Sequence, residues 1–182
     1  MFLGLDISTS ITGYTIIDKT GTVLECEHID LKTCDNLFEK ATKVKKQLTK
    51  LFQQYPIESV SIEESLQMFA MGKSSSKVLS ILSKFNGIVS WIIYENFCQN
   101  ITYFPAVTAR KMVGFNVIKG KKGKDVVMDF LLDAVRLNKA PWFVPQYGRT
   151  GKLKPFCFDR ADSWVISQAG FLKWKKTQSL NS

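Results

Sequence analysis

The sequence is poor in the residues that build zinc sites and disulfide frameworks. It contains one histidine, His28, and four cysteines, none of which belongs to a CxxC pair. Zinc sites normally need several such ligands at short spacing, so zinc chemistry is not expected. We expect the cysteines to be reduced and structural, and His28 to be a surface residue of a strand.

Long apolar runs are missing as well. The most apolar stretch is residues 85–97. It contains polar side chains, and it is too short to cross a bilayer, which takes about 20 apolar residues. At the N-terminus, Asp6 interrupts the first apolar run and no basic segment precedes that run, so no secretory signal is expected. These absences favour a cytosol-like compartment.

Acidic residues are outnumbered by basic ones. The 16 Asp and Glu residues against 25 Lys and Arg residues give a formal net charge of +9. A basic balance of this size favours a polyanionic partner, with simple solubility as the alternative. The length of 182 residues, 45% of them hydrophobic, suits one domain with a sizeable core.

The hydrophobic pattern changes between strand and helix periods along the chain. It predicts strands over residues 2–7, 12–17, 22–31, 59–64 and 100–106. It predicts a helix capped by Asp35 that runs to about Tyr55, and helices over residues 74–97, 108–113, 125–137 and 159–174. Residues 138–157 are expected to be irregular, and the tail after about residue 174 to be frayed. This order predicts an α/β layered fold with a mixed sheet.

Two acidic residues end short apolar strands. Asp6 follows Leu3 and Leu5, so the two-residue period of a strand places it on the opposite face from them. Glu63 stands in the same relation to its own strand, whereas Glu64 has the opposite parity. Ligand sites in open α/β sheets lie outside the carboxyl ends of the strands. If the two strands are neighbours, Asp6 and Glu63 are neighbours too.

A second acidic pair stands at the start of the last predicted helix. Asp159 and Asp162 are three residues apart and share a face. They either cap the helix and suit its dipole, or they join Asp6 and Glu63. Four converging carboxylates would raise one another's pKa values unless a cation were bound, and hard oxygen ligands suit Mg²⁺ or Mn²⁺. Two such ions can hold the attacking water and the leaving oxygen of one phosphate, which predicts phosphodiester hydrolysis.

The blocks "GLDISTSITGYTIID", "SIEE" and "FDRADSWVIS", in this order, resemble the signature blocks of RuvC-type Holliday junction resolvases, members of the RNase H-like nuclease superfamily. The resemblance spans nearly the whole chain. It implies a single RNase H-like nuclease domain over residues 1–182, with a central mixed five-stranded sheet flanked by helices. It also implies an endonuclease that uses two Mg²⁺ (or Mn²⁺) ions per active site and nicks two opposed strands of a four-way DNA junction symmetrically. Asp6, Glu63, Asp159 and Asp162 match the catalytic metal ligands.

The resemblance further implies a homodimer that binds branched DNA. The 74–97 helix resembles the dimerisation helix of the family, which suits its apolar residues around most of its girth. Lys124 resembles the basic residue near the scissile phosphate, with Lys119, Lys121 and Lys122 as competing candidates. Phe69 resembles the aromatic residue at the junction centre, or else packs inward as an ordinary loop residue. The candidate DNA-binding residues are Phe69, Lys73, Lys119, Lys121, Lys122, Arg149 and Lys152.

Two features depart from the family pattern. Ser8 stands where bacterial members usually carry glycine, and serine there is familiar among phage and large-virus relatives. If the chain is of phage or viral origin, we expect it to act in a host cytoplasm. Otherwise we expect it in the cytoplasm, associated with the nucleoid. The hydroxyls of residues 8–12 either line the phosphate path or satisfy a tight turn. Residues 138–157 look like an insertion, which either contacts unpaired DNA or is a surface loop pinned by its aromatics. The residues concerned are Trp142, Tyr147, Arg149, Lys152 and Lys154.

Three alternatives compete with junction resolution. The same two-metal chemistry could act on flaps, forks or nicked branches. A sugar-kinase-like or ATPase fold also opens with an aspartate and a hydroxyl-rich hairpin, but it needs glycine near the phosphate and a second domain. A junction-binding module without catalysis is disfavoured by the four carboxylates.

Overall fold

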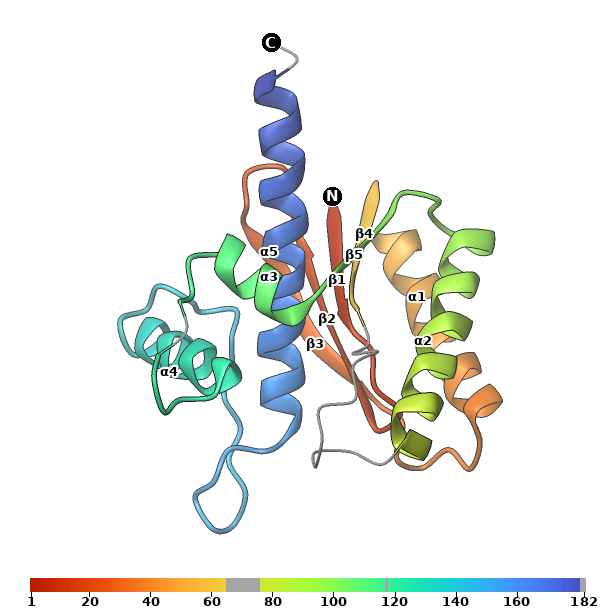
Figure 1. Cartoon of the computed structure of the whole chain (residues 1–182), viewed down its shortest axis with the longest axis horizontal. Helices are drawn as coiled ribbons and strands as arrows, with labels where there is room; N and C mark the ends of the chain where they lie inside the picture. The colour runs from red at the N-terminus through yellow and green to blue at the C-terminus, as the bar shows by residue number, and fades with distance from the viewer. Residues whose placement is uncertain (65–75, 117, 181–182) are drawn as a thin grey trace.

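The computed structural model describes residues 1–64, 76–116 and 118–180. Its core is a five-stranded sheet in the order β3-β2-β1-β4-β5 (Figure 1). The strands are β1 (Phe2–Asp6), β2 (Ile11–Ile17), β3 (Val23–Asp30), β4 (Ser59–Glu63) and β5 (Ile101–Phe104). The helices are α1 (Leu37–Gln54), α2 (Ser76–Asn96), α3 (Ala106–Met112), α4 (Gly123–Arg136) and α5 (Phe156–Leu180).

The sheet is mixed, as predicted. β1 pairs antiparallel with β2, and β2 pairs antiparallel with β3. β1 pairs in parallel with β4, and β4 pairs in parallel with β5. In the β1–β4 register Leu5 lies beside Ile62, so the following residues, Asp6 and Glu63, come to the same edge of the sheet.

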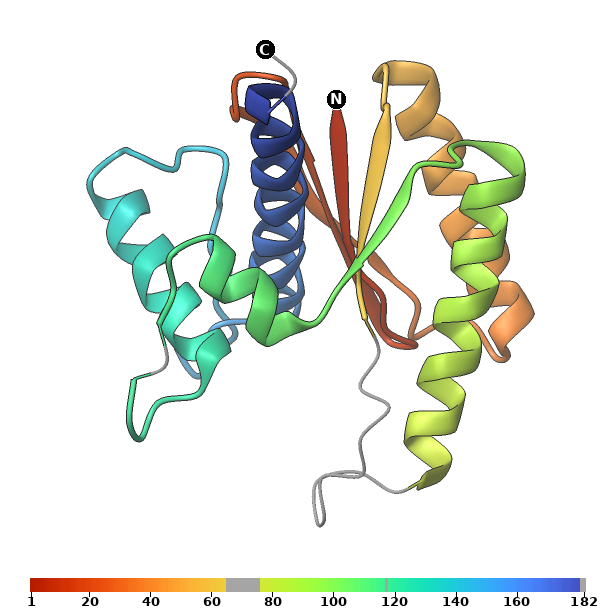
Figure 2. The same cartoon turned by 45° about the horizontal axis from the view of Figure 1, so that its top comes forward.

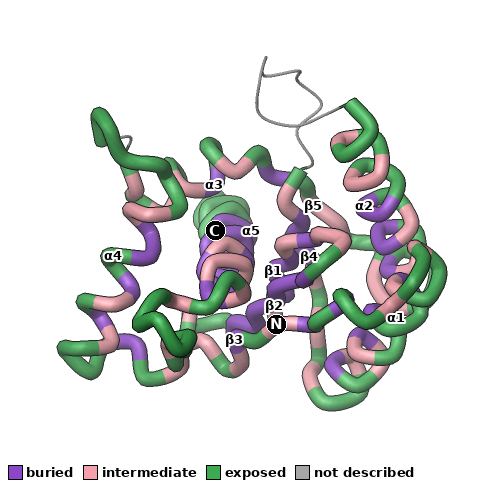
Figure 3. Tube along the Cα trace, turned by 90° about the horizontal axis from the view of Figure 1, so that it is seen from below, coloured by how far each residue is buried: buried purple, intermediate pink, exposed green. Residues whose placement is uncertain are grey.

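Helices cover both faces of the sheet (Figures 1 and 2). α1 and α2 pack on the face that carries Leu3, Leu5 and the apolar residues of β4. α5 crosses the opposite face, with α3 and α4 beyond it. Buried residues concentrate in the sheet and in the part of α5 that crosses it (Figure 3). Asp6 and Glu63 lie on the α5 side, because the two-residue strand period turns Asp6 away from Leu3 and Leu5, and Glu63 away from Val60 and Ile62.

A glycine lets the start of α5 approach the sheet closely. A Cβ atom on Gly13 in β2 would collide with the backbone carbonyl of Asp159. The chain therefore needs glycine there, because a side chain would push the first turn of α5 away from the strands. The contact sets the distance between Asp159 and the strand that adjoins Asp6.

The boundaries of α5 correct two predictions. The helix begins at Phe156, so Asp159 lies within its first turn and is not the residue that caps it. The tail after residue 174 is helical as far as Leu180, because Trp174 packs on Phe2 with ring centroids 5.1 Å apart and neither glycine nor proline follows to end the helix. Asn36, and not Asp35, caps α1, since its side chain accepts hydrogen bonds from two backbone N–H groups of the first turn.

The segment before α5 is irregular, as predicted, up to residue 155. Its regular pairing is an isolated antiparallel bridge between Tyr147 and Leu153. Among the described residues, no helix has both the length and the apolar character that a membrane crossing requires.

Candidate active site at the carboxyl ends of β1 and β4

Asp6 and Glu63 lie side by side at the ends of two parallel central strands. Burial, followed by the negative charges of Glu63, Asp162 and Asp159, raises the pKa of Asp6 well above its usual range. Burial, Asp162 and Asp159 likewise raise the pKa of Glu63 to about 7, against a lowering effect of Arg110. The four predicted acids therefore act on one another electrostatically, as the parity and spacing of the sequence predict.

α5 supplies the other two acids from its first two turns. Burial and then the charge of Asp162 raise the pKa of Asp159 to about 6, while the nearby ammonium groups of Lys124 and Lys32 oppose this rise. The side chain of Asp162 is 14% exposed and is ion-paired with Arg110. The interpretation of this pair as simple capping residues does not account for their proximity to Asp6 and Glu63.

The donor set fits a hard divalent cation. Carboxylate oxygens are the ligands that Mg²⁺ and Mn²⁺ prefer, and a buried group of four carboxylates is unfavourable without positive charge. Among the described residues, no group of three or more Asp, Glu, His or Cys side chains is positioned to bind one metal ion. Binding would therefore require these side chains to turn toward a common point from their fixed positions on β1, β4 and α5.

Arg110 is a site residue that the sequence analysis missed. It lies on α3, and its Nη2 donates a hydrogen bond of 2.8 Å to Oδ1 of Asp162. Its charge lowers the pKa values of Asp6 and Glu63. The sequence does contain a signal that could have indicated Arg110. Pro105 ends β5 directly after Phe104, which lies beside Glu63, so the helix that follows starts next to the acids.

The lysines near the start of α4 differ in their surroundings. Lys124 lies beside the site, with its Nζ 5.3 Å from the centre of the Phe158 ring and its charge acting on Asp159. Lys121 is instead paired with Asp129 at 2.8 Å. Lys119 and Lys122 are exposed. Lys32, two residues after the end of β3, is a further cation near Asp159 that the sequence analysis did not single out.

The remaining predicted DNA-binding residues fall in two groups. Phe69 and Lys73 lie outside the described residues. Arg149 and Lys152 are exposed in a turn that Gly148 closes by donating its N–H to the carbonyl of Lys152 at 2.8 Å.

The 138–157 segment was expected either to contact unpaired DNA or to be a surface loop held in place by its aromatic residues, and its aromatic residues differ in exposure. Tyr147 is exposed. Trp142 instead packs against Trp164 of α5, with ring centroids 5.6 Å apart. Lys154 lies over the ring of Phe156 at 5.7 Å. The segment is therefore pinned by Trp142 and presents its turn to solvent.

A buried arginine separates the two acids of α5 in the sequence. Arg160 is 1% exposed. Its Nε donates to the carbonyl of Cys26 at 2.9 Å, its Nη1 donates to the carbonyl of Val144 at 3.1 Å, and its guanidinium lies over the ring of Phe143 at 5.4 Å. These contacts tie α5 to β3 and to the 138–157 segment, which fixes the rotation of the helix that carries Asp159 and Asp162.

The hydroxyls after β1 are used within the chain. Ser8 Oγ donates to the carbonyl of Ile11 at 2.6 Å and accepts from the N–H of the same residue at 3.1 Å. Thr12 Oγ1 donates to the carbonyl of Ser8 at 3.3 Å. These contacts favour the tight-turn interpretation over a phosphate path. His28 is partly buried and stacks on Phe156 at 4.1 Å, so it is not a plain strand surface residue.

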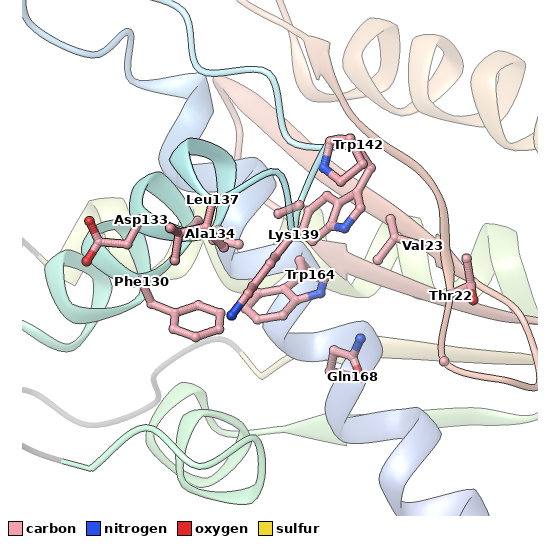
Figure 4. Close-up of a pocket in the computed structure, with 14 residues that line it drawn as sticks. Thr22, Val23, Phe130, Asp133, Ala134, Leu137, Lys139, Trp142, Trp164 and Gln168 are labelled. Atoms are coloured by element: carbon pink, nitrogen blue, oxygen red, sulfur yellow. The ribbon is translucent and has the colours of Figure 1, made fainter.

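A cavity of about 640 Å³ lies apart from the acids, between α4, α5 and the turn before β3 (Figure 4). Phe130, Trp142 and Trp164 form much of its wall, and Lys139 extends across it. Among the described residues that line it, none is one of the four predicted acids. The cavity is therefore separate from the group of predicted acids at the strand ends.

A mixed five-stranded sheet with acids at the ends of its two central parallel strands and on a helix across it defines an α/β protein of the RNase H-like class. The family model described as "Crossover junction endodeoxyribonuclease RuvC" matches residues 2–141. The chain belongs to this family of junction-resolving endonucleases, which confirms the resemblance stated above. The match ends before Asp159 and Asp162, so the assignment of these two rests on the geometry of α5.

Solved structures share the fold over nearly the whole chain. Thermus thermophilus RuvC in complex with a Holliday junction substrate has a TM-score of 0.63 and 10% identity, over 96% of this chain and 94% of that one. The Fowlpox virus resolvase with junction DNA has a TM-score of 0.51 and 14% identity, over 95% and 97%. The yeast mitochondrial Holliday junction resolvase Ydc2 has a TM-score of 0.54 and 14% identity, over 96% and 78%. No curated protein sequence matches this chain.

Proposed function

We propose that this chain resolves four-way DNA junctions with a divalent-metal site formed by Asp6, Glu63, Asp159 and Asp162. The observation that carries the proposal is the convergence of the acids: the β1–β4 register brings Asp6 and Glu63 to one edge of the sheet, and Gly13 lets the first turn of α5, with Asp159, approach it closely. The raised pKa of Asp6, caused by burial and by the other three acids, agrees with this geometry. The RuvC family membership, the net charge of +9 and the junction complexes of the structural neighbours support a DNA substrate. Such an activity would serve DNA recombination and repair, in the cytoplasm or at the nucleoid.

The proposed metal ligands are held by rigid elements. β1 and β4 fix Asp6 and Glu63, and Asn86 of α2 donates to the carbonyl of Glu63 at 3.1 Å. α5 fixes Asp159 and Asp162 through Gly13 and the contacts of Arg160. Two Mg²⁺ ions, when bound, would supply Lewis-acid activation of the attacking water and stabilise the leaving oxygen. The protein's own part is to hold the carboxylates and to attract the phosphate.

Basic side chains around the acids would position the DNA backbone. Lys124 and Lys32 lie close enough to Asp159 for their charges to lower its pKa, and this supports a role for both in binding the scissile phosphate. Exposed cations further out would contact other phosphates and make binding salt-dependent. They are Lys119, Lys121, Lys122, Arg149 and Lys152. Phe69 and Lys73, which lie outside the described residues, are proposed as further DNA contacts.

A homodimer through α2 would pair two such sites. Trp91 and Tyr94 of α2 are 59% and 48% exposed and stack on each other at 6.2 Å, so this helix presents aromatic surface beyond the face it buries on the sheet. Exposed aromatic surface of this kind favours a protein interface. Sedimentation at micromolar concentration is expected to give a dimer, and Trp91→Ser to shift it toward the monomer. A wild-type monomer, with or without DNA, would refute paired incision by one dimer.

Substrate competition tests the proposed specificity. Differently labelled four-way junction, flap, fork and linear duplex are offered together with Mg²⁺, and the cuts are mapped. Two symmetric nicks on the junction, with 5′-phosphate and 3′-hydroxyl ends, are expected. Preferential cutting of flaps or forks would assign the same chemistry to another branched substrate. Binding of the junction without any cut would favour a non-catalytic module.

A further inference from the structure

Arg110 inserts a cation into the acid cluster from a separate helix. α3 packs against α5, and Nη2 of Arg110 lies 2.8 Å from Oδ1 of Asp162. The Arg110 side chain is 19% exposed and that of Asp162 is 14% exposed, so the pair is largely removed from water. A charge pair in this setting is screened much less than a surface pair.

The pairing is incomplete on the arginine side. A guanidinium has five N–H donors, and a carboxylate can accept two of them in parallel. Asp162 accepts from one, and within the described part of the chain the buried Nε of Arg110 has no hydrogen-bond partner. A buried donor without a partner costs free energy, so this position of the arginine depends mainly on the charge of the acids.

The same acid is a proposed ligand of a divalent ion. An ion at the cluster and the Arg110 guanidinium would compete for the Asp162 carboxylate, and they would repel each other at short distance. Two ligands that favour different states of one site are linked, so each lowers the apparent affinity of the other.

The structure provides a second place for the guanidinium. A groove of about 420 Å³ adjoins Arg110 between α3 and α4, lined also by Lys111, Phe115, Asn116 and Gly123. Gly123 keeps this side open, because a Cβ atom there would lie 3.1 Å from Nη1 of Arg110. Rotation of the side chain away from Asp162 would bring its donors toward the Asn116 side of the groove.

We propose that Arg110 is a resident counter-cation of the acid cluster, which pairs with Asp162 in the ion-free protein and moves into the α3–α4 groove when a divalent ion binds. The inference rests on the proposed metal site. Arg110 is a positioning residue: it holds Asp162 and prevents uncompensated carboxylate repulsion until the ion arrives, at the cost of weaker ion binding.

Calorimetric titration with Mn²⁺ tests the competition. Arg110→Met should bind Mn²⁺ about tenfold more tightly than the wild type, because the competing cation is gone. The matched control is Arg136→Met, since Arg136 makes the same 2.8 Å pair with Asp133, on the exposed surface of α4. It should leave the affinity unchanged. Unchanged or weaker binding by Arg110→Met would overturn the proposal.

Nitrogen-15 NMR of the arginine Nε–H groups tests the movement in the wild-type protein, so it does not depend on how well Arg110→Met folds. The Arg110 signal is identified by its loss in Arg110→Lys. Addition of Mg²⁺ should shift this signal and leave that of Arg136 in place; a stationary Arg110 signal under saturating Mg²⁺ would refute displacement. Two results would refute the metal site itself and with it this inference. One is that the wild type binds no Mn²⁺, and the other is that Asp6→Asn, which lacks a proposed ligand, binds Mn²⁺ with the same affinity as the wild type.

Discussion

Without divalent ions, Glu63 should make the folding stability depend on pH. Burial and the charge of Asp162 raise its pKa from 4.5 in the unfolded chain to about 7 in the folded protein. The native state therefore holds this proton more tightly than the unfolded chain does. Its contribution to stability is present in full below pH 4.5 and is lost as the pH rises through about 7. At about 1.4 kcal/mol per pH unit, the loss is about 3 kcal/mol.

Urea unfolding in EDTA, from about pH 4 to about pH 8, measures this contribution. The free energy of unfolding of the wild type, relative to that of Glu63→Gln, should fall by about 3 kcal/mol across the window. Glu64→Gln is the matched control, because the neighbouring Glu64 has the opposite strand parity and is exposed. Its difference from the wild type should be nearly constant with pH.

Saturating Mg²⁺ should reduce the fall, because the ion then replaces the proton as the partner of the carboxylates. The refuting result is a difference in the free energy of unfolding between the wild type and Glu63→Gln that stays level or rises between pH 4.5 and pH 7 in EDTA. It would show that the acids are not electrostatically coupled.

Two further substitutions probe the elements around the site. Arg160→Met should lower the free energy of unfolding by about 3 kcal/mol in a urea titration, because it leaves two buried carbonyls without their donor; a loss within about 0.5 kcal/mol would contradict this. Lys124→Gln should slow junction cleavage about 100-fold while changing junction affinity much less. Lys121→Gln, whose ammonium is held by Asp129, is its control, and equal slowing by both would remove the special role of Lys124.

The sheet and the acidic strand ends could be predicted because short-range rules fix them. The two-residue strand period turns Asp6 and Glu63 each away from the apolar residues of its own strand. The prediction also needed β1 and β4 to pair in parallel as neighbouring strands. This pairing follows from the connection through α1 on one side of the sheet. Asp159 and Asp162 followed from a three-residue spacing that any helix would bring to one face.

The parts that were missed depend on contacts between distant segments. Arg110 is an ordinary basic residue of a short helix, and its role exists because α3 packs on α5 beside Asp162. The extension of α5 to Leu180 follows from the packing of Trp174 on Phe2, more than 170 positions earlier in the sequence. The role of Arg160 depends on Cys26 and Val144, which no local pattern connects to it.

The most direct test of the four-acid site is junction cleavage by Asp6→Asn. A labelled four-way junction is incubated with Mg²⁺ and either the wild type or the variant, and the same samples are examined for cut strands and for the gel-shifted complex. The wild type should cut and Asp6→Asn should not, while both retain the complex, because the substitution removes a metal ligand and leaves the basic surface intact. Cutting by Asp6→Asn at close to the wild-type rate would contradict the assignment of the active site.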